Sequence, residues 1–188
     1  MNRAKKIKSL MVAVLAVAFL SCTANAWWND EWTLRKKITL DTSEKGLGLA
    51  DAAGTVPLLI RLHEGNFKFD MAKEDGSDLR FLVADDKTLL TYHIEKWDAI
   101  MGEAFVWVKV PDVKPGAQAT LWLYYGNSGP KAVKVDDSKG TYDKDTALVL
   151  HFNEHGTPAA DSSASGLTAQ NVGAAVDGSM IGSGIWVA

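Results

Sequence analysis

The stretch AFVWVKV, residues 104–110, decides the fold of this chain. Its aliphatic residues, one alanine and three valines, stand at every second position, and Phe105, Trp107 and Lys109 stand between them. A repeat of two residues is typical of a β-strand whose two faces meet different surroundings. The stretch therefore predicts a strand with one aliphatic face and one face that carries two aromatic rings.

The next stretch, ATLWLYY at residues 119–125, repeats the pattern after a Pro-Gly turn. Two leucines alternate with Trp122 and Tyr124. Upstream, the same alternation and the turns between the runs predict four more strands, at residues 32–40, 56–62, 79–83 and 90–94. Pro57 places the second of these at a sheet edge or a strand start. One helical turn is expected within 66–73. Six short strands predict an all-β fold, an antiparallel β-sandwich over residues 27–130.

The chain changes character after residue 130. Residues 131–145 carry mixed charges and few large apolar groups, which predicts a linker. A strand is expected at 147–152, and the chain stops in the apolar run Gly184–Ala188. A segment of this size with two strands is too small to bury a core of its own. We therefore expect residues 146–188 to be an incomplete second β-sandwich.

The first 26 residues predict a secretory signal peptide. Three lysines precede an apolar run from Leu10 to Leu20, and Ala24-Asn25-Ala26 supplies a small-residue cleavage site. The run is shorter than a membrane span, which needs about 20 apolar residues. Lipidation at Cys22 is the alternative, but Phe19 stands where lipoprotein signals usually carry leucine. We predict an exported protein, periplasmic or extracellular, that is cleaved after Ala26.

Charge and cysteine content exclude several classes of function for the cleaved chain. Four of the 20 basic residues lie in the signal peptide, which leaves 16 against 23 acidic residues and a net charge of −7. This balance argues against nucleic acid and anionic lipid as partners. The single cysteine is Cys22, so the cleaved chain has neither a disulfide nor a thiol and must depend on its core. No later segment is long and apolar enough to span a membrane.

Several blocks resemble known families. Four blocks of the chain resemble a bacterial domain of unknown function, labelled two-three-four-one. They are WWNDEW (27–32) with RKKIT (35–39), DGSDLRF (75–81), EKWD (95–98) with GEAFVWVKV (102–110), and LYYGN (123–127). The segment LVLHF (148–152), with the later IGSG (181–184), resembles the start of a laminin-G or concanavalin-A-like lectin domain. Similar pairs stand at the front of TolQ/ExbB-type proton channel proteins. The resemblance implies an envelope protein with sugar- or surface-binding neighbours, and it brings no catalytic residues.

Aromatic side chains are the best candidates for a binding site. If the two aromatic strands share a face, Trp107, Trp122 and Tyr124 form one surface, which Trp97 could join. Flat rings of this kind stack on the C–H faces of sugars. The alternative is that this face is the second half of a two-sheet core. We predict Trp97, Trp107, Trp122 and Tyr124 as ligand-binding residues.

Acidic and histidine side chains give weaker signals. Asp75 with Asp78, and Asp85 with Asp86, fit ordinary turns better than a calcium loop. A glycosidase needs two carboxyls ~5–9 Å apart, for which Glu95, Asp98 and Glu103 are available. The four histidines, of which only His151 and His155 have a helical spacing, are interpreted as structural: His63, His93, His151 and His155. We predict no catalytic residue, no metal and no cofactor.

These observations lead to one functional expectation with two alternatives. We expect a non-enzymatic recognition module that binds a glycan or another cell-surface polymer. The first alternative is the periplasmic interaction or sensor part of a TolQ/ExbB-like energy-transducing system, with an envelope protein as partner. The second is a glycan-active enzyme.

Overall fold

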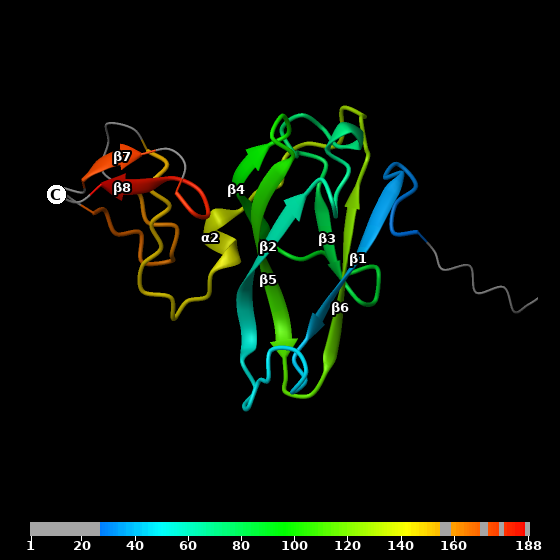
Figure 1. The fold of residues 1–188 in the computed structure, drawn as a ribbon, viewed down its shortest axis with the longest axis horizontal. Coiled ribbons are helices and arrows are strands. Elements are labelled where there is room, and N and C mark those ends of the chain that lie inside the picture. The colour runs from blue at the N-terminus through cyan, green and yellow to red at the C-terminus, as the bar shows by residue number, and fades with distance from the viewer. Residues whose placement is uncertain (1–26, 155–158, 170–172, 177–178, 187–188) are drawn as a thin grey trace, which may run out of the picture.

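A computed structural model describes residues 27–154, 159–169, 173–176 and 179–186. The predicted signal peptide and His155 lie outside these residues. Six strands form two three-stranded antiparallel sheets that face each other, as Figure 1 shows, and this confirms the predicted all-β sandwich. The strands are β1 (Leu34–Asp41), β2 (Gly54–His63), β3 (Arg80–Val83), β4 (Tyr92–Asp98), β5 (Glu103–Val113) and β6 (Gln118–Tyr125).

The two sheets have the orders β1-β6-β3 and β2-β5-β4. Strand β2, which contains Pro57, is an edge strand, as predicted. The consecutive strands β5 and β6 belong to different sheets, because the turn between them carries the chain across the sandwich. The backbone N–H of the buried Thr42 holds this turn by donating to the carbonyl of Ala117 (3.0 Å). The outward side chains of β5 and β6 therefore lie on opposite surfaces of the molecule.

The main core lies between the sheets. The inward side chains of β5 and β6 are the aliphatic ones that the alternation predicts, and they are almost fully buried together with Phe81 and Tyr92. Burying one large apolar side chain contributes roughly 1.5–3 kcal/mol, so this layer is the main source of stability. The 3-10 turn η1 (Phe69–Met71) falls within the predicted helical turn and adds the buried Phe69 to the core.

A second, smaller core covers the outside of the β1-β6-β3 sheet. Its buried members are Trp32, Leu82, Tyr124 and Ala132, with Trp28 and Trp122 packed at the margin. The indole N–H of Trp32 donates to the carbonyl of Asp78 (2.6 Å) and fixes the N-terminal segment on the sheet. The outside of this sheet is therefore largely covered by the chain itself.

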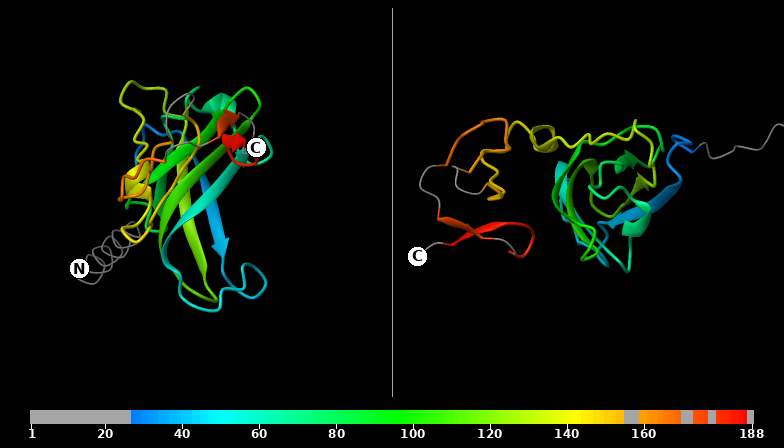
Figure 2. Two further views of the ribbon diagram at one scale, coloured as in Figure 1. Left: turned by 90° about the vertical axis from the view of Figure 1, so that its left-hand side faces the viewer. Right: turned by 90° about the horizontal axis from the view of Figure 1, so that it is seen from above.

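The segment predicted as a linker lies against the other sheet. The backbone N–H of Asp137 donates to the carbonyl of Tyr92 (2.9 Å), and Asp136 accepts from the N–H of Ile94 (2.6 Å). The short helix α2 (Ser138–Thr141) follows, and the ammonium group of Lys109 donates to the carbonyls of Gly140 and Tyr142. Figure 2 shows how the chain then leaves the sandwich.

Near the C-terminus, β7 (Ala174–Val176) pairs antiparallel with β8 (Gly184–Trp186). The predicted strand at 147–152 does not form, although all its residues are described: it has a single bridge, between Leu150 and Asp161. Phe152 has a φ of +54°, which is incompatible with extended backbone. None of the helices in the described part of the chain has the length and apolarity of a membrane span.

Candidate functional site

The candidate site is the outer face of the β2-β5-β4 sheet, the surface that points away from the main core. Strand β5 is central, so each of its outward side chains has a neighbour on both sides. Phe105 is flanked by Arg61 and Lys96, and Trp107 by Leu59 and His93. This face therefore carries both aromatic rings of the stretch that decides the fold, next to charged groups.

A β-bulge in β4 brings additional polar groups to this face. Ile94 pairs with Val106 and Lys96 pairs with Phe105, so Glu95 is an extra residue without an opposite partner. Bulges of this kind re-aim a side chain. As a result Glu95 and Lys96, although consecutive, both contact outward groups of β5: Glu95 accepts from the indole N–H of Trp107 (3.1 Å), and Lys96 donates to Glu103 (3.1 Å).

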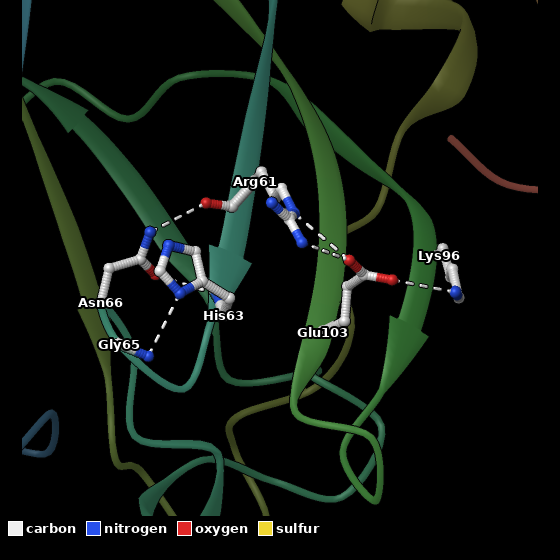
Figure 3. Close-up of polar contacts among 6 residues, drawn as sticks. All are labelled: Arg61, His63, Gly65, Asn66, Lys96 and Glu103. Atoms are coloured by element: carbon white, nitrogen blue, oxygen red, sulfur yellow. Dashed lines mark hydrogen bonds and ion pairs between the residues drawn. The ribbon is translucent and has the colours of Figure 1, made fainter. Parts of the chain in front are cut away.

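A row of charges crosses the three strands at one end of the face. Arg61 and Lys96 approach the carboxylate of Glu103 from either side, as Figure 3 shows, at 2.9 and 3.1 Å. The hydrogen bond from Lys96 is the main cause of a lowered pKa at Glu103, followed by that from Arg61. An open depression of about 460 Å³ borders the row and is lined by Arg61, His63, Glu64, Gly65, Met101, Gly102 and Glu103.

The loop after β2 forms the rim of this depression. Asn66 accepts from the N–H of His63 (2.9 Å) and donates to the carbonyl of Arg61 (3.1 Å). The N–H of Gly65 donates to Nδ1 of His63 (3.1 Å), which fixes the imidazole ring (Figure 3). The rim is thus fixed by its own hydrogen bonds.

A second group lies where β4 meets the C-terminal segment. It consists of three side chains that each offer an atom able to bind a metal: His93, Glu95 and His151. The two imidazole nitrogens and the carboxylate oxygen lie within 4.8 Å of one another. Nδ1 of His151 is 2.5 Å from Oε2 of Glu95, and Nε2 of His93 is 3.7 Å from the same oxygen. The ring of Tyr142 lies beside His93, with centroids 5.6 Å apart. These three residues could hold a metal ion.

Glu95 is ionised at neutral pH in this environment. Burial by itself would raise its pKa, but the neighbouring rings of His151 and His93 and the hydrogen bond from Trp107 outweigh it and lower the pKa to about 2. The neighbours of Glu103 act in the same direction. A glycosidase acid needs a raised pKa, and neither Glu95 nor Glu103 holds its proton in this way.

The structure does not bring together the four aromatic residues that the sequence predicts as a site. Trp107 lies half-buried on the outer face of β2-β5-β4. Trp122 lies on the opposite surface beneath the guanidinium of Arg35, 4.3 Å from its ring centre. Tyr124 is fully buried, so its ring offers no face to a ligand, and its hydroxyl donates to Asp86 (2.6 Å). Trp97 packs against the main core beside Phe69.

The acidic turn residues have structural roles here. Asp75 accepts from the N–H of Ser77, and Asp85 accepts from Thr88, which are the expected turn interactions. The buried Asp78 accepts from the backbone N–H groups of Gly126 and Asn127. Asp75, Asp78 and Asp85 therefore stabilise the turns and strand ends around them.

Sequence reasoning missed the cluster of two histidines and a glutamate. The pattern His93-x-Glu95 on a strand was the available signal, because alternate residues share a face. His151 follows 56 residues after Glu95, and no spacing rule connects positions so far apart. Its place beside Glu95 depends on how the C-terminal segment folds back on the sheet.

Comparison with known families adds one finding. A family model described as Domain of unknown function (DUF2341) matches residues 75–164. The match confirms the resemblance to this domain for that part of the chain, which includes β3 to β6, α2 and the cluster of His93, Glu95 and His151. No curated protein and no solved structure is significantly similar to the chain.

Proposed function

We propose that this protein is an exported recognition module that binds a glycan through the outer face of the β2-β5-β4 sheet. The observation that carries the proposal is the row of Arg61, Glu103 and Lys96, which borders an open depression on the same face as the half-buried Trp107. Export rests on the signal peptide predicted at residues 1–26. The resemblance of residues 146–188 to a lectin domain supports the same class of ligand.

The chemistry of this face suits sugar hydroxyls. A carboxylate accepts hydrogen bonds from hydroxyl groups, while guanidinium and ammonium groups donate to them. Arg61 and Lys96 already form ion pairs with Glu103, so these side chains lose little further entropy when a ligand binds. Glu103, Phe105 and Trp107 recur at every second residue of β5, so the row of charges and the indole ring are about 13 Å apart along the strand. A ligand that contacts both must be an extended chain of several sugar units.

Tryptophan emission provides the test, with the processed chain titrated against a panel of polysaccharides and peptidoglycan. We expect a saturable change with one glycan. Trp107→Ala should weaken that binding by about tenfold, the value of one aromatic stacking contact. Glu103→Gln should weaken it as well, because the charge that organises Arg61 and Lys96 is lost.

Trp122→Ala is the matched control, since Trp122 is a half-buried tryptophan of β6, which belongs to the other sheet and carries Trp122 on the opposite surface. It should leave glycan affinity unchanged. Loss of affinity in Trp122→Ala but not in Trp107→Ala would place the site on the other sheet and refute the proposal, as would the lack of any response in the wild-type protein. Circular dichroism of each variant verifies folding.

A protein partner is the second candidate, and one observation favours it. The loop between β4 and β5 exposes Ile100 (95%) and Met101 (74%) beside the depression, and Met101 also lines it. Exposed apolar groups of this kind mark contact surfaces between proteins. The contact would belong to an envelope assembly of the TolQ/ExbB type. Crosslinking in cells that depends on Ile100, together with unchanged glycan binding in Ile100→Ser, would favour this function.

A further inference from the structure

A cluster of three side chains joins two distant parts of the sequence: His93, Glu95 and His151. His93 and Glu95 lie on β4, and His151 lies in the segment after α2. Their ligand-type atoms lie within 4.8 Å of one another. Two imidazole nitrogens and a carboxylate oxygen at one point are a donor set that binds transition metals.

Three buried ring nitrogens of this group have no hydrogen-bond partner among the described residues. His93 is 3% exposed, and neither of its ring nitrogens has a hydrogen-bond partner among the residues that the structure describes. Nε2 of His151 is also buried, and no described residue is hydrogen-bonded to it. An unpartnered buried polar group costs roughly 1–3 kcal/mol, so an imidazole with two such atoms calls for an explanation. A ligand at Nε2 of His93 supplies one.

We propose that His93, Glu95 and His151 bind a divalent transition metal, and that Zn²⁺ is the ion they fit best. Zinc bonds to histidine nitrogen and carboxylate oxygen are about 2.0–2.2 Å long, so tetrahedral ligand atoms lie about 3.3 Å apart. The separations of 2.5 and 3.7 Å around Oε2 of Glu95 bracket this value. Small side-chain movements therefore convert the observed geometry into a coordination shell.

The first role of the metal would be structural, because it would crosslink the sandwich to the segment that follows it. Two ligands are on the sandwich and the third, His151, is on the segment that follows it, so the ion joins that segment to β4. Three protein ligands leave the fourth tetrahedral position to water or to a donor atom of a bound partner. The indole of Trp107 already donates to Glu95, which orients that carboxylate as outer-shell hydrogen bonds do in metal sites.

Calorimetry with ZnCl₂ on the processed chain, purified without a histidine tag, tests the site. One ion should bind per chain with a micromolar or lower Kd. Loss of an outer-shell partner costs roughly 10–100-fold in metal affinity. We expect each ligand variant to weaken zinc binding by roughly 100-fold or more: His93→Ala, Glu95→Gln and His151→Ala. Co²⁺ should give the visible absorption of a tetrahedral complex, and Zn²⁺ should displace it.

His63→Ala is the matched control, because His63 lies on the same sheet and its Nδ1 already accepts from Gly65. Zinc affinity should be unchanged in this variant. His151→Ala alters only the C-terminal segment, so tryptophan emission can verify that the sandwich remains folded. Amide exchange within 147–167 should slow on zinc addition in the wild type only. Equal zinc affinity of the wild type and His151→Ala, or no binding at all, would overturn the proposal.

Discussion

Tyr92 shows how one buried side chain sets the behaviour of the protein in alkali. It is 1% exposed, and its hydroxyl donates to the carbonyl of Leu79 (2.5 Å) inside the main core. Burial disfavours the phenolate and raises the pKa of Tyr92 to about 12, from an ordinary value of 10. The stability linked to the neutral hydroxyl is therefore complete below pH 10 and disappears as the pH rises to 12.

We predict two effects of Tyr92→Phe on stability. The free energy of unfolding at pH 7 should fall by about 1–2 kcal/mol, because the carbonyl of Leu79 loses its partner. Between pH 10 and 12 the wild type should lose about 3 kcal/mol more than the variant does. Urea unfolding across this pH range measures both. Parallel pH profiles for the two proteins would show that another group governs the alkaline loss.

Only some residues of the candidate site can be assigned to its face from the sequence. Trp107 and Glu103 could be assigned to one face of a strand, because alternation in β5 is regular. Lys96 could not, since the bulge at Glu95 that places these two consecutive residues on one face depends on how β4 pairs with β5. The position of His151 could not be predicted either, because it depends on the fold of a segment in which the predicted strand does not form.

At the level of elements, the turn before β3 and the tryptophan of β4 depend on each other. Gly76 has a φ of +66°, and a Cβ added there would lie 2.8 Å from the ring of Trp97. Trp97 in turn donates its indole N–H to the carbonyl of Glu74 in the same turn (2.8 Å). The turn closes over the ring, and only glycine provides both the backbone conformation and the space.

Gly76→Ala should therefore destabilise the protein by about 2–4 kcal/mol, from left-handed strain and overlap with the ring together. Gly116→Ala is a matched control, because Gly116 has the same φ of +66° with nothing within 4 Å of the added Cβ. That variant should lose only about 1–2 kcal/mol. Denaturant unfolding gives both values. Equal losses would mean that Trp97 moves aside without cost.

The six strands of the sandwich illustrate how much of the fold can be predicted from sequence. Each predicted run overlaps an observed strand, because alternation and turn residues are local properties. The pairing is not local. Strand β6 follows β5 along the chain, yet it pairs with β1 and β3 across the sandwich. For this reason Trp107 and Trp122, which were expected on one surface, lie on opposite ones.

On the scale of the whole molecule, Asp161 organises the segment that follows the sandwich. Its carboxylate accepts from the backbone N–H groups of Val149, Ser163 and Leu167 at 2.8–3.0 Å. Burial would raise the pKa of Asp161, but these bonds and the hydroxyl of Ser163 lower it well below its usual value. Its stabilising effect is therefore present above the ordinary aspartate pKa near 4 and is lost as the pH falls below it.

Asp161→Asn should loosen residues 147–154 and 159–167 and leave the sandwich intact, because the carboxylate of Asp161 bonds within these ranges in the described part of the chain. Hydrogen exchange should show faster amides at Val149 and Leu167, with no change in β5 or β6. The wild type should approach the exchange rates of the variant as the pH is lowered from 5 to about 3, after correction for intrinsic exchange. Faster exchange throughout the sandwich would show that the two parts unfold as one unit.

The hydrogen bonds that Asp136 and Asp137 make to β4 also matter for solubility. An outer strand with free N–H and carbonyl groups is a template on which another chain can add a strand, and natural proteins cover such edges. Here the cover comes from residues beyond the sixth strand. A version shortened to residues 27–130 would keep every strand of the sandwich and still present a bare edge, so it would tend to self-associate. We therefore expect the charged stretch after Pro130 to protect the domain against aggregation.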